Sequence, residues 1–207
     1  MKQAYVVTEN KRDLALIEKL LSEEFGSRVG FVAGEGSDSA ETMARSLLVS
    51  KHVPVVLVLD SDTSNAKANQ ERRETVSEYL GSVTSDAPYQ VVMAVPELET
   101  VFFKDTSVLE HIINRSVSKP ERQTAEFAPK RVLAQLLETD SEHPMKKAVS
   151  LLTKDSIAAL REHPIIHAMR TFLNRTLAPK PTATYASAAS ARINGKTQRG
   201  TGRSHKR

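Results

Sequence analysis

The first half of the chain alternates between short β-branched runs and longer segments with helical spacing of apolar residues. Four runs have the length and composition of strands: residues 4–8, 28–33, 54–59 and 89–95. Strands that alternate with helical segments are typical of βαβ units, so the pattern predicts an α/β fold with a largely parallel sheet. The run at 54–59, PVVLVL, is apolar throughout, which favours a central strand buried on both faces.

Helical segments follow the first three of these runs. Residues 11–25 place Leu14, Ile17 and Phe25 on one face of a helix. GEGSDSAETMARSLL is expected to open a second helix, with Asp38 as its N-cap and Glu41 three residues later in a capping-box pattern. Residues 65–80 are polar and helix-prone.

Beyond residue 104 the strand pattern ends and short helical segments take over. They are expected at residues 107–115, 128–138, 145–152, 156–163 and 164–177. Residues 179–207 are poor in large apolar side chains, so they bury too little surface to offset chain entropy. The sequence therefore predicts an α/β core at 1–104, a helical C-terminal element at 105–178 and a disordered basic tail at 179–207.

The net charge of +4 is concentrated at the C-terminal end. Residues 182–207 hold six Lys and Arg and no acid, which leaves 23 of the 29 bases against all 25 acids in residues 1–181. A uniformly basic nucleic-acid-binding face is thus not indicated. We expect the tail to add affinity for nucleic acid without sequence preference. The chain has no Cys and no apolar run of membrane-spanning length, so we expect a cytoplasmic protein without membrane contact.

Acidic residues follow three of the four predicted strands. They are Glu9 and Asp13 after the first, Asp60 and Asp62 after the third, and Glu97 and Glu99 after the fourth. Ligands of open parallel sheets bind outside the carboxyl ends of the strands, where these acids are expected to gather. Six carboxylates at close range repel one another unless cations neutralise them. Oxygen ligands without Cys or clustered His favour Mg²⁺, Mn²⁺ or Ca²⁺ over zinc.

The D-x-D spacing has a geometric reason of its own. Residues two apart on an extended segment point the same way, so Asp60 and Asp62 are expected to converge on one or two ions. Glu97 and Glu99 repeat this spacing. An acid after a buried strand is also a common turn former or helix N-cap, and for Asp62 alone that alternative stays open.

Three segments together resemble the Toprim family, and most closely the OLD-type nucleases and stand-alone Toprim-like proteins. VVTENKRDLALIEKLL is similar to the family's strand, glutamate and helix start, VLVLDSDTS to its D-x-D strand, and VPELETVFF to an acidic motif that closes the site. Asn10 stands where the family usually has Gly. The resemblance covers about the first half of the chain, and it implies a Toprim-like, Rossmann-like sheet.

The resemblance also implies roles for individual residues. Glu9 and Asp13 would hold one metal, Asp60 and Asp62 would share the ions, and Glu97 or Glu99 would complete the site. Lys154 stands where OLD-type enzymes have a lysine near the phosphate, although an ordinary exposed lysine at a helix start is the alternative.

These expectations describe a Mg²⁺- or Mn²⁺-dependent nuclease that hydrolyses phosphodiesters of DNA or RNA, with Glu9, Asp60, Asp62 and Lys154 as catalytic residues. OLD-type relatives suggest phage or plasmid defence, together with an ATPase or other protein partner. One alternative is a non-catalytic Toprim-like binding or assembly module. A minor alternative is a dehalogenase-type phosphatase, because DSDTS resembles its nucleophile motif with Asp60 as the attacking group.

Overall fold

A computed structural model describes residues 1–84, 86–139 and 143–178. Its sheet has four parallel strands in the order β2-β1-β3-β4, and the predicted α/β class is confirmed. The strands are β1 (Ala4–Thr8), β2 (Val29–Ala33), β3 (Val55–Asp60) and β4 (Tyr89–Ala94). The prediction of a disordered tail at 179–207 lies outside the described residues.

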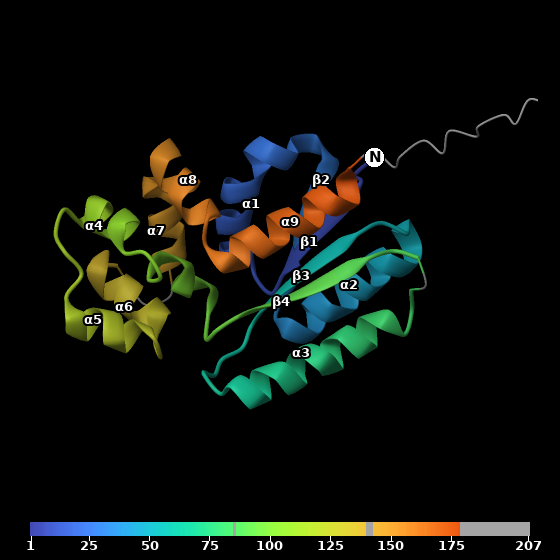
Figure 1. Ribbon diagram of the computed structural model, residues 1–207, viewed down its shortest axis with the longest axis horizontal. Coiled ribbons are helices and arrows are strands. Elements are labelled where there is room, and N and C mark those ends of the chain that lie inside the picture. Colours follow the sequence, from blue (N-terminus) through green and yellow to red (C-terminus); the bar gives the residue numbers. More distant parts are fainter. Residues whose placement is uncertain (85, 140–142, 179–207) are drawn as a thin grey trace, which may run out of the picture.

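Helices cover both faces of the sheet (Figure 1). Those on one face are α1 (Lys11–Phe25) and α9 (Pro164–Leu177), and those on the other are α2 (Ser37–Lys51) and α3 (Ala66–Gly81). The central strand β3 contributes Val56 and Val58 to the first core and Val55 and Leu57 to the second. The prediction that this run is buried on both faces is confirmed.

Apart from the short η1 (Gly26–Arg28) between α1 and β2, the remaining helices of the described residues lie beside the carboxyl ends of the strands (Figure 1). They are η2 (Leu98–Phe102), α4 (Ser107–Ile113), α5 (Lys119–Ala125), α6 (Pro129–Leu136), α7 (Pro144–Leu151) and α8 (Lys154–Arg161). The sequence reading missed α5, which begins with a capping box between Ser118 and Glu121. Apolar side chains of these helices join the buried cluster formed by α1, α9 and the sheet.

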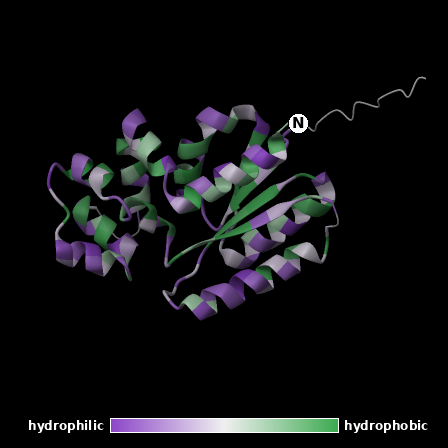
Figure 2. Cartoon of the chain, viewed as in Figure 1, coloured by the Kyte–Doolittle hydropathy of each residue, from purple (hydrophilic) through white to green (hydrophobic). Residues whose placement is uncertain are grey.

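Hydropathy follows this arrangement, since the strands are mainly apolar and α3 is mainly polar (Figure 2). Two ion pairs fasten the last helices to α1: Arg170 contacts Glu24 at 2.7 Å, and Arg161 contacts Glu23 at 2.9 Å. Across the described ranges, no helix is both long and apolar enough to cross a membrane.

The expected N-cap of α2 is wrong. Gly36, with φ of +102°, occupies that position, and Asp38 lies inside the first helical turn. A glycine fits there because L side chains rarely adopt such a φ. Asp38 stabilises the helix from its first turn instead, because a negative charge there interacts favourably with the helix dipole.

Candidate metal centre at the carboxyl ends of the strands

The centre of the sheet contains a topological switch point. The chain runs from β1 outward to β2, then crosses back to β3 and continues to β4, so the order reverses between β1 and β3. Glu9 follows β1 and Asp60 ends β3 at this position, and Glu9 Oε1 accepts the backbone N–H of Asp60 at 3.0 Å. In open α/β sheets this crevice is where ligands bind.

A tight turn after β2 holds the backbone of Glu9. The amide of Gly36 donates to the Glu9 carbonyl at 2.9 Å, and the amide of Gly34 donates to the Thr8 carbonyl at 2.8 Å. A Cβ on Gly34 would lie 2.6 Å from the Ala40 nitrogen, so a larger residue would push α2 away. The glycines thus let the start of α2 approach the end of β1 closely.

Asp13 is held by the residue that begins α1. Asn10 is the N-cap: its Oδ1 accepts from the amides of Arg12 and Asp13 at 2.9 and 3.0 Å, and its Nδ2 donates to Asp13 Oδ2 at 2.7 Å. Asn10 has φ of −148°, an extended conformation that any residue can adopt. It acts as a cap that also orients a buried acid, since Asp13 is 6% exposed.

Asp60 and Asp62 do not lie on one extended segment, so the geometric reason given for their spacing is wrong. Asp60 is the last residue of β3, and its Oδ1 accepts the amide of Leu98 at 2.9 Å. Asp62 is exposed and has φ of +54°, and its amide donates to the Pro96 carbonyl at 3.0 Å. The chain turns sharply between the two acids, so Asp62 lies beside Glu97 in a neighbouring cavity.

The acids after β4 lie on the short helix η2. Glu97 is its N-cap, and Glu97 Oε2 accepts the amide of Lys130 at 3.3 Å. Glu99 lies in its first turn and is 5% exposed. The amide of Leu98, between them, is the donor to Asp60, so η2 brings all three acids to one edge of the sheet.

Four of these carboxyl groups have raised pKa values. Burial is the largest cause in each case, and it raises the pKa of Asp60 to about 9. It likewise raises the pKa of Glu9 to about 7, that of Asp13 to about 6 and that of Glu99 to about 7. The negative charges of Asp13, Glu99 and Glu9 raise the pKa of Asp60 further. The carboxylates are therefore close enough to repel one another.

Positive charge at the centre is sparse. Lys130 lowers the pKa of both Asp13 and Glu99, Arg12 lowers that of Asp13, and Arg72 lowers that of Glu9. Within the described part of the chain, no ion pair to Lys, Arg or His includes any of the six acids. The repulsion among them is thus only partly offset by the protein.

The donor set fits a hard divalent cation in chemistry, since all six side chains supply carboxylate oxygen. The ligand geometry is not preformed: over residues 1–84, 86–139 and 143–178, no three His, Cys, Asp or Glu side chains are arranged to hold an ion. Glu9, Asp60 and Glu97 are turned toward backbone amides instead. An ion would have to draw these carboxylates away from those donors.

Lys154 lies exposed at the first residue of α8, after the N-cap Thr153. No interaction described in the structure links it to the six acids, and its catalytic role stays a prediction. Lys130 is the lysine whose charge acts on them. Sequence reasoning passed over Lys130 because it stands in an amphipathic helix whose pattern indicates only packing.

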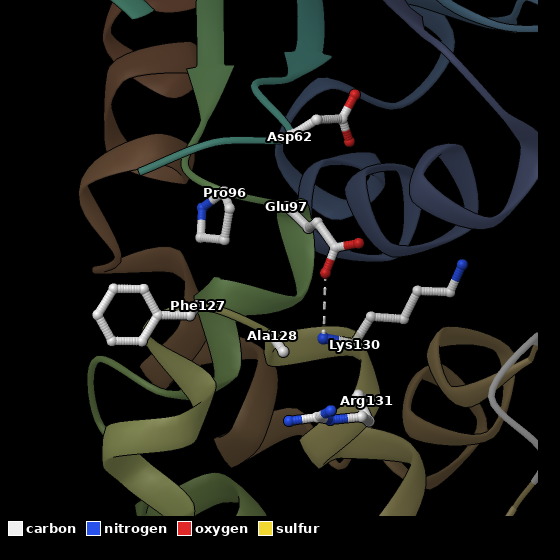
Figure 3. A pocket seen from close by; sticks show the side chains of 7 residues that line it. All are labelled: Asp62, Pro96, Glu97, Phe127, Ala128, Lys130 and Arg131. Atoms are coloured by element: carbon white, nitrogen blue, oxygen red, sulfur yellow. Dashed lines mark hydrogen bonds between the residues drawn. The ribbon is translucent and has the colours of Figure 1, made fainter. Parts of the chain in front are cut away.

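Beside the acids lies a cavity of about 400 Å³ (Figure 3). Its lining residues are Asp62, Pro96, Glu97, Phe127, Ala128, Lys130 and Arg131. One wall comes from the loops after β3 and β4, and the other from the turn between α5 and α6 together with the first turn of α6. The Oγ of Ser64 donates to the Glu126 carbonyl at 3.4 Å, which joins the two walls.

Comparison with known proteins adds little to this geometry. No family model matches the chain, and no curated protein matches it. Among solved structures, the C-terminal region of the Xanthomonas campestris pv. campestris OLD protein is similar over 83% of this chain and 97% of that chain, with 12% identity and a TM-score of 0.38.

Proposed function

We propose that this protein is a Mg²⁺- or Mn²⁺-dependent nuclease of the Toprim type that hydrolyses phosphodiester bonds of DNA or RNA. The observation that carries the proposal is the convergence of carboxylates from three strand ends on the switch point between β1 and β3. Groups that repel one another, are buried and have few protein cations nearby are suited to a bound divalent ion.

The carboxylates that follow the strands would hold the ion, and the loops would present the substrate to it. The ligands proposed are Glu9, Asp13, Asp60, Asp62, Glu97 and Glu99. A bound divalent ion supplies activation of water and stabilisation of the leaving oxygen. Asn10 keeps Asp13 oriented, and the amide of Leu98 orients Asp60. Asp62 lines the cavity and is the exposed one of the six acids, so it would be open to incoming substrate.

Lys130 and Arg131 supply the positive charge on the opposite wall of the cavity (Figure 3). A phosphodiester lying in the cavity would meet these cations on one side and the ion-loaded acids on the other. Positive charge on both sides of the phosphate favours phosphodiester hydrolysis, because negative charge builds on the phosphate oxygens in the transition state. An ATPase or other protein partner remains part of the proposal.

The direct test is a cleavage assay with single- and double-stranded DNA and RNA in Mg²⁺ and in Mn²⁺. We expect Glu9→Gln and Asp60→Asn each to lower cleavage at least a hundredfold, because each removes a ligand charge from the same centre. Glu74→Gln is the matched control. Glu74 lies exposed on α3, so this variant should cleave nucleic acid as the wild type does.

Two results would replace the proposal. Turnover of a small phosphomonoester that is lost with Asp60→Asn but kept with Glu9→Gln would indicate a dehalogenase-type phosphatase, in which Asp60 is the nucleophile. Absence of cleavage of every nucleic acid in either metal would indicate a non-catalytic module.

A further inference from the structure

Phe127 is an exposed aromatic residue at the mouth of the cavity beside the acids. Its exposed fraction of 72% is far above that of the other aromatic side chain among the exposed large hydrophobics, Tyr79 at 37%. Arg45 covers the Tyr79 ring at 4.5 Å, whereas Phe127 lines the cavity together with cationic and acidic residues. Leaving a phenyl ring in water forgoes the free energy of burial, so its position beside polar groups points to a ligand with an apolar face.

Hydrogen bonds hold the backbone of the turn that carries this ring. The amides of Phe127 and Ala128 both donate to the Thr124 carbonyl, at 3.1 and 3.0 Å, so the turn between α5 and α6 is closed by hydrogen bonds. The contact from Ser64 to the carbonyl of Glu126 ties the same turn to the loop that carries Asp62. The turn that carries Phe127 is therefore linked to the loop that carries Asp62.

Charge in the cavity is divided between its two walls. Asp62 and Glu97 lie on one, and Lys130 and Arg131 on the other. In Figure 3 the Arg131 side chain runs in the direction of Phe127, while that of Lys130 rises on the side of Glu97. A cavity lined by both cations and an aromatic ring suits a nucleotide, whose phosphate binds the cations and whose base stacks on the ring.

We infer that the cavity binds a single-stranded segment of nucleic acid, with one base stacked on Phe127 and the adjoining phosphate held by Lys130 and Arg131. This inference rests on the proposed function and names its substrate class. In a continuous duplex the base faces are already stacked on each other, so the ring would find no partner there. A volume of about 400 Å³ lies in the range of pockets that take one small-molecule-sized unit, such as a single nucleotide.

The sequence makes a direct test available because it contains no Trp. A Phe127→Trp variant has one indole, whose fluorescence a stacked base quenches. The probe is a short oligothymidylate with phosphorothioate linkages that resist cleavage, compared with a duplex of equal length. Val49→Trp is the matched control, because Val49 is 49% exposed near the far end of α2, roughly 20 Å along the helix from the strand ends.

We expect the single strand to quench Phe127→Trp, the duplex to leave it nearly unchanged, and Val49→Trp to respond to neither. Phe127→Ala should weaken binding of the single strand about tenfold, and Phe127→Tyr should retain it, because tyrosine also offers a stacking face. Arg131→Gln should weaken binding and make it less sensitive to salt, since it removes one phosphate contact.

No quenching, equal quenching by the duplex, or unchanged affinity in Phe127→Ala would overturn the inference. The binding assay involves no turnover, so its failure is separate from failure of the proposed nuclease activity. If cleavage is lost in Asp60→Asn but unchanged in Phe127→Ala, the proposed nuclease activity is supported and the proposed binding site is rejected. Quenching and stacking in a protein that cleaves nothing would support the site and reject the nuclease.

Discussion

Replacing Asp60 by Asn should make the metal-free protein more stable, although it removes a candidate ligand. The substitution keeps an oxygen to accept the amide of Leu98, and it removes a carboxyl group whose charged form is disfavoured by burial and by the negative charges of its neighbours. The pKa of Asp60 rises from 3.8 to about 9 on folding. At pH 8 the folded protein therefore holds a proton on Asp60 that the unfolded chain has released.

Each pH unit above the unfolded pKa then corresponds to about 1.4 kcal/mol, so the full cost at pH 8 would be about 6 kcal/mol. Water entry and small movements of neighbouring side chains recover part of this cost, and we expect Asp60→Asn to raise the free energy of unfolding by about 3 kcal/mol. The measurement is urea denaturation in EDTA at pH 8. Saturating Mg²⁺ should stabilise the wild type by about 3 kcal/mol at 100 times the dissociation constant, and should leave the variant nearly unchanged.

A variant that is less stable than wild type in EDTA would show that Asp60 does not lie in a repulsive cluster. An equal gain from Mg²⁺ in both proteins would show that the ion binds elsewhere. Glu74→Gln serves again as the control, and it should change neither value, because Glu74 is exposed on α3.

Two further predictions concern the same centre. In EDTA the free energy of unfolding should fall as pH rises from about 4 to about 9, because carboxyl groups with raised pKa values favour the folded state only while they are protonated. Mg²⁺ should flatten this profile, and a free energy of unfolding that rises with pH over the same range without metal would contradict the reasoning. Asn10→Ala should cost about 2 kcal/mol in denaturant unfolding, against about 1 kcal/mol for Asn65→Ala, because both remove a helix N-cap but only Asn10 also donates to a buried carboxylate; equal losses would assign Asn10 a capping role alone.

The sheet could be predicted from the sequence because each of its strands is a compact run of β-branched residues with a clear end. The strand at 4–8 matches the structure, those at 28–33 and 89–95 are each one residue too long, and the one at 54–59 is shifted by one residue at both ends. The helix α5 was missed because KPERQTA has a single buried residue, Ala125, and so shows no apolar periodicity. Its capping box between Ser118 and Glu121 was the signal that could have revealed it.

The acids of the candidate centre could be selected from the sequence because the position after a parallel strand is fixed by topology. Their side-chain directions could not, since these depend on local backbone. Asp62 lies in a left-handed turn and Glu99 in a short helix, and neither conformation follows from a two-residue spacing. Phe127 and Lys130 were beyond sequence reasoning because only tertiary packing brings the turn before α6 to the strand ends.

Glu97 would have two partners if it is a ligand of the proposed ion. In the structure its carboxylate is the acceptor for the amide of Lys130 in the first turn of α6. If the carboxylate turns to an ion, that amide loses its acceptor, and a phosphate oxygen of a bound strand is the natural replacement. Binding of the ion would then free the Lys130 amide at the start of α6, and a phosphate of the bound strand would accept a hydrogen bond from that amide. The ion would thus prepare the donor that the strand needs.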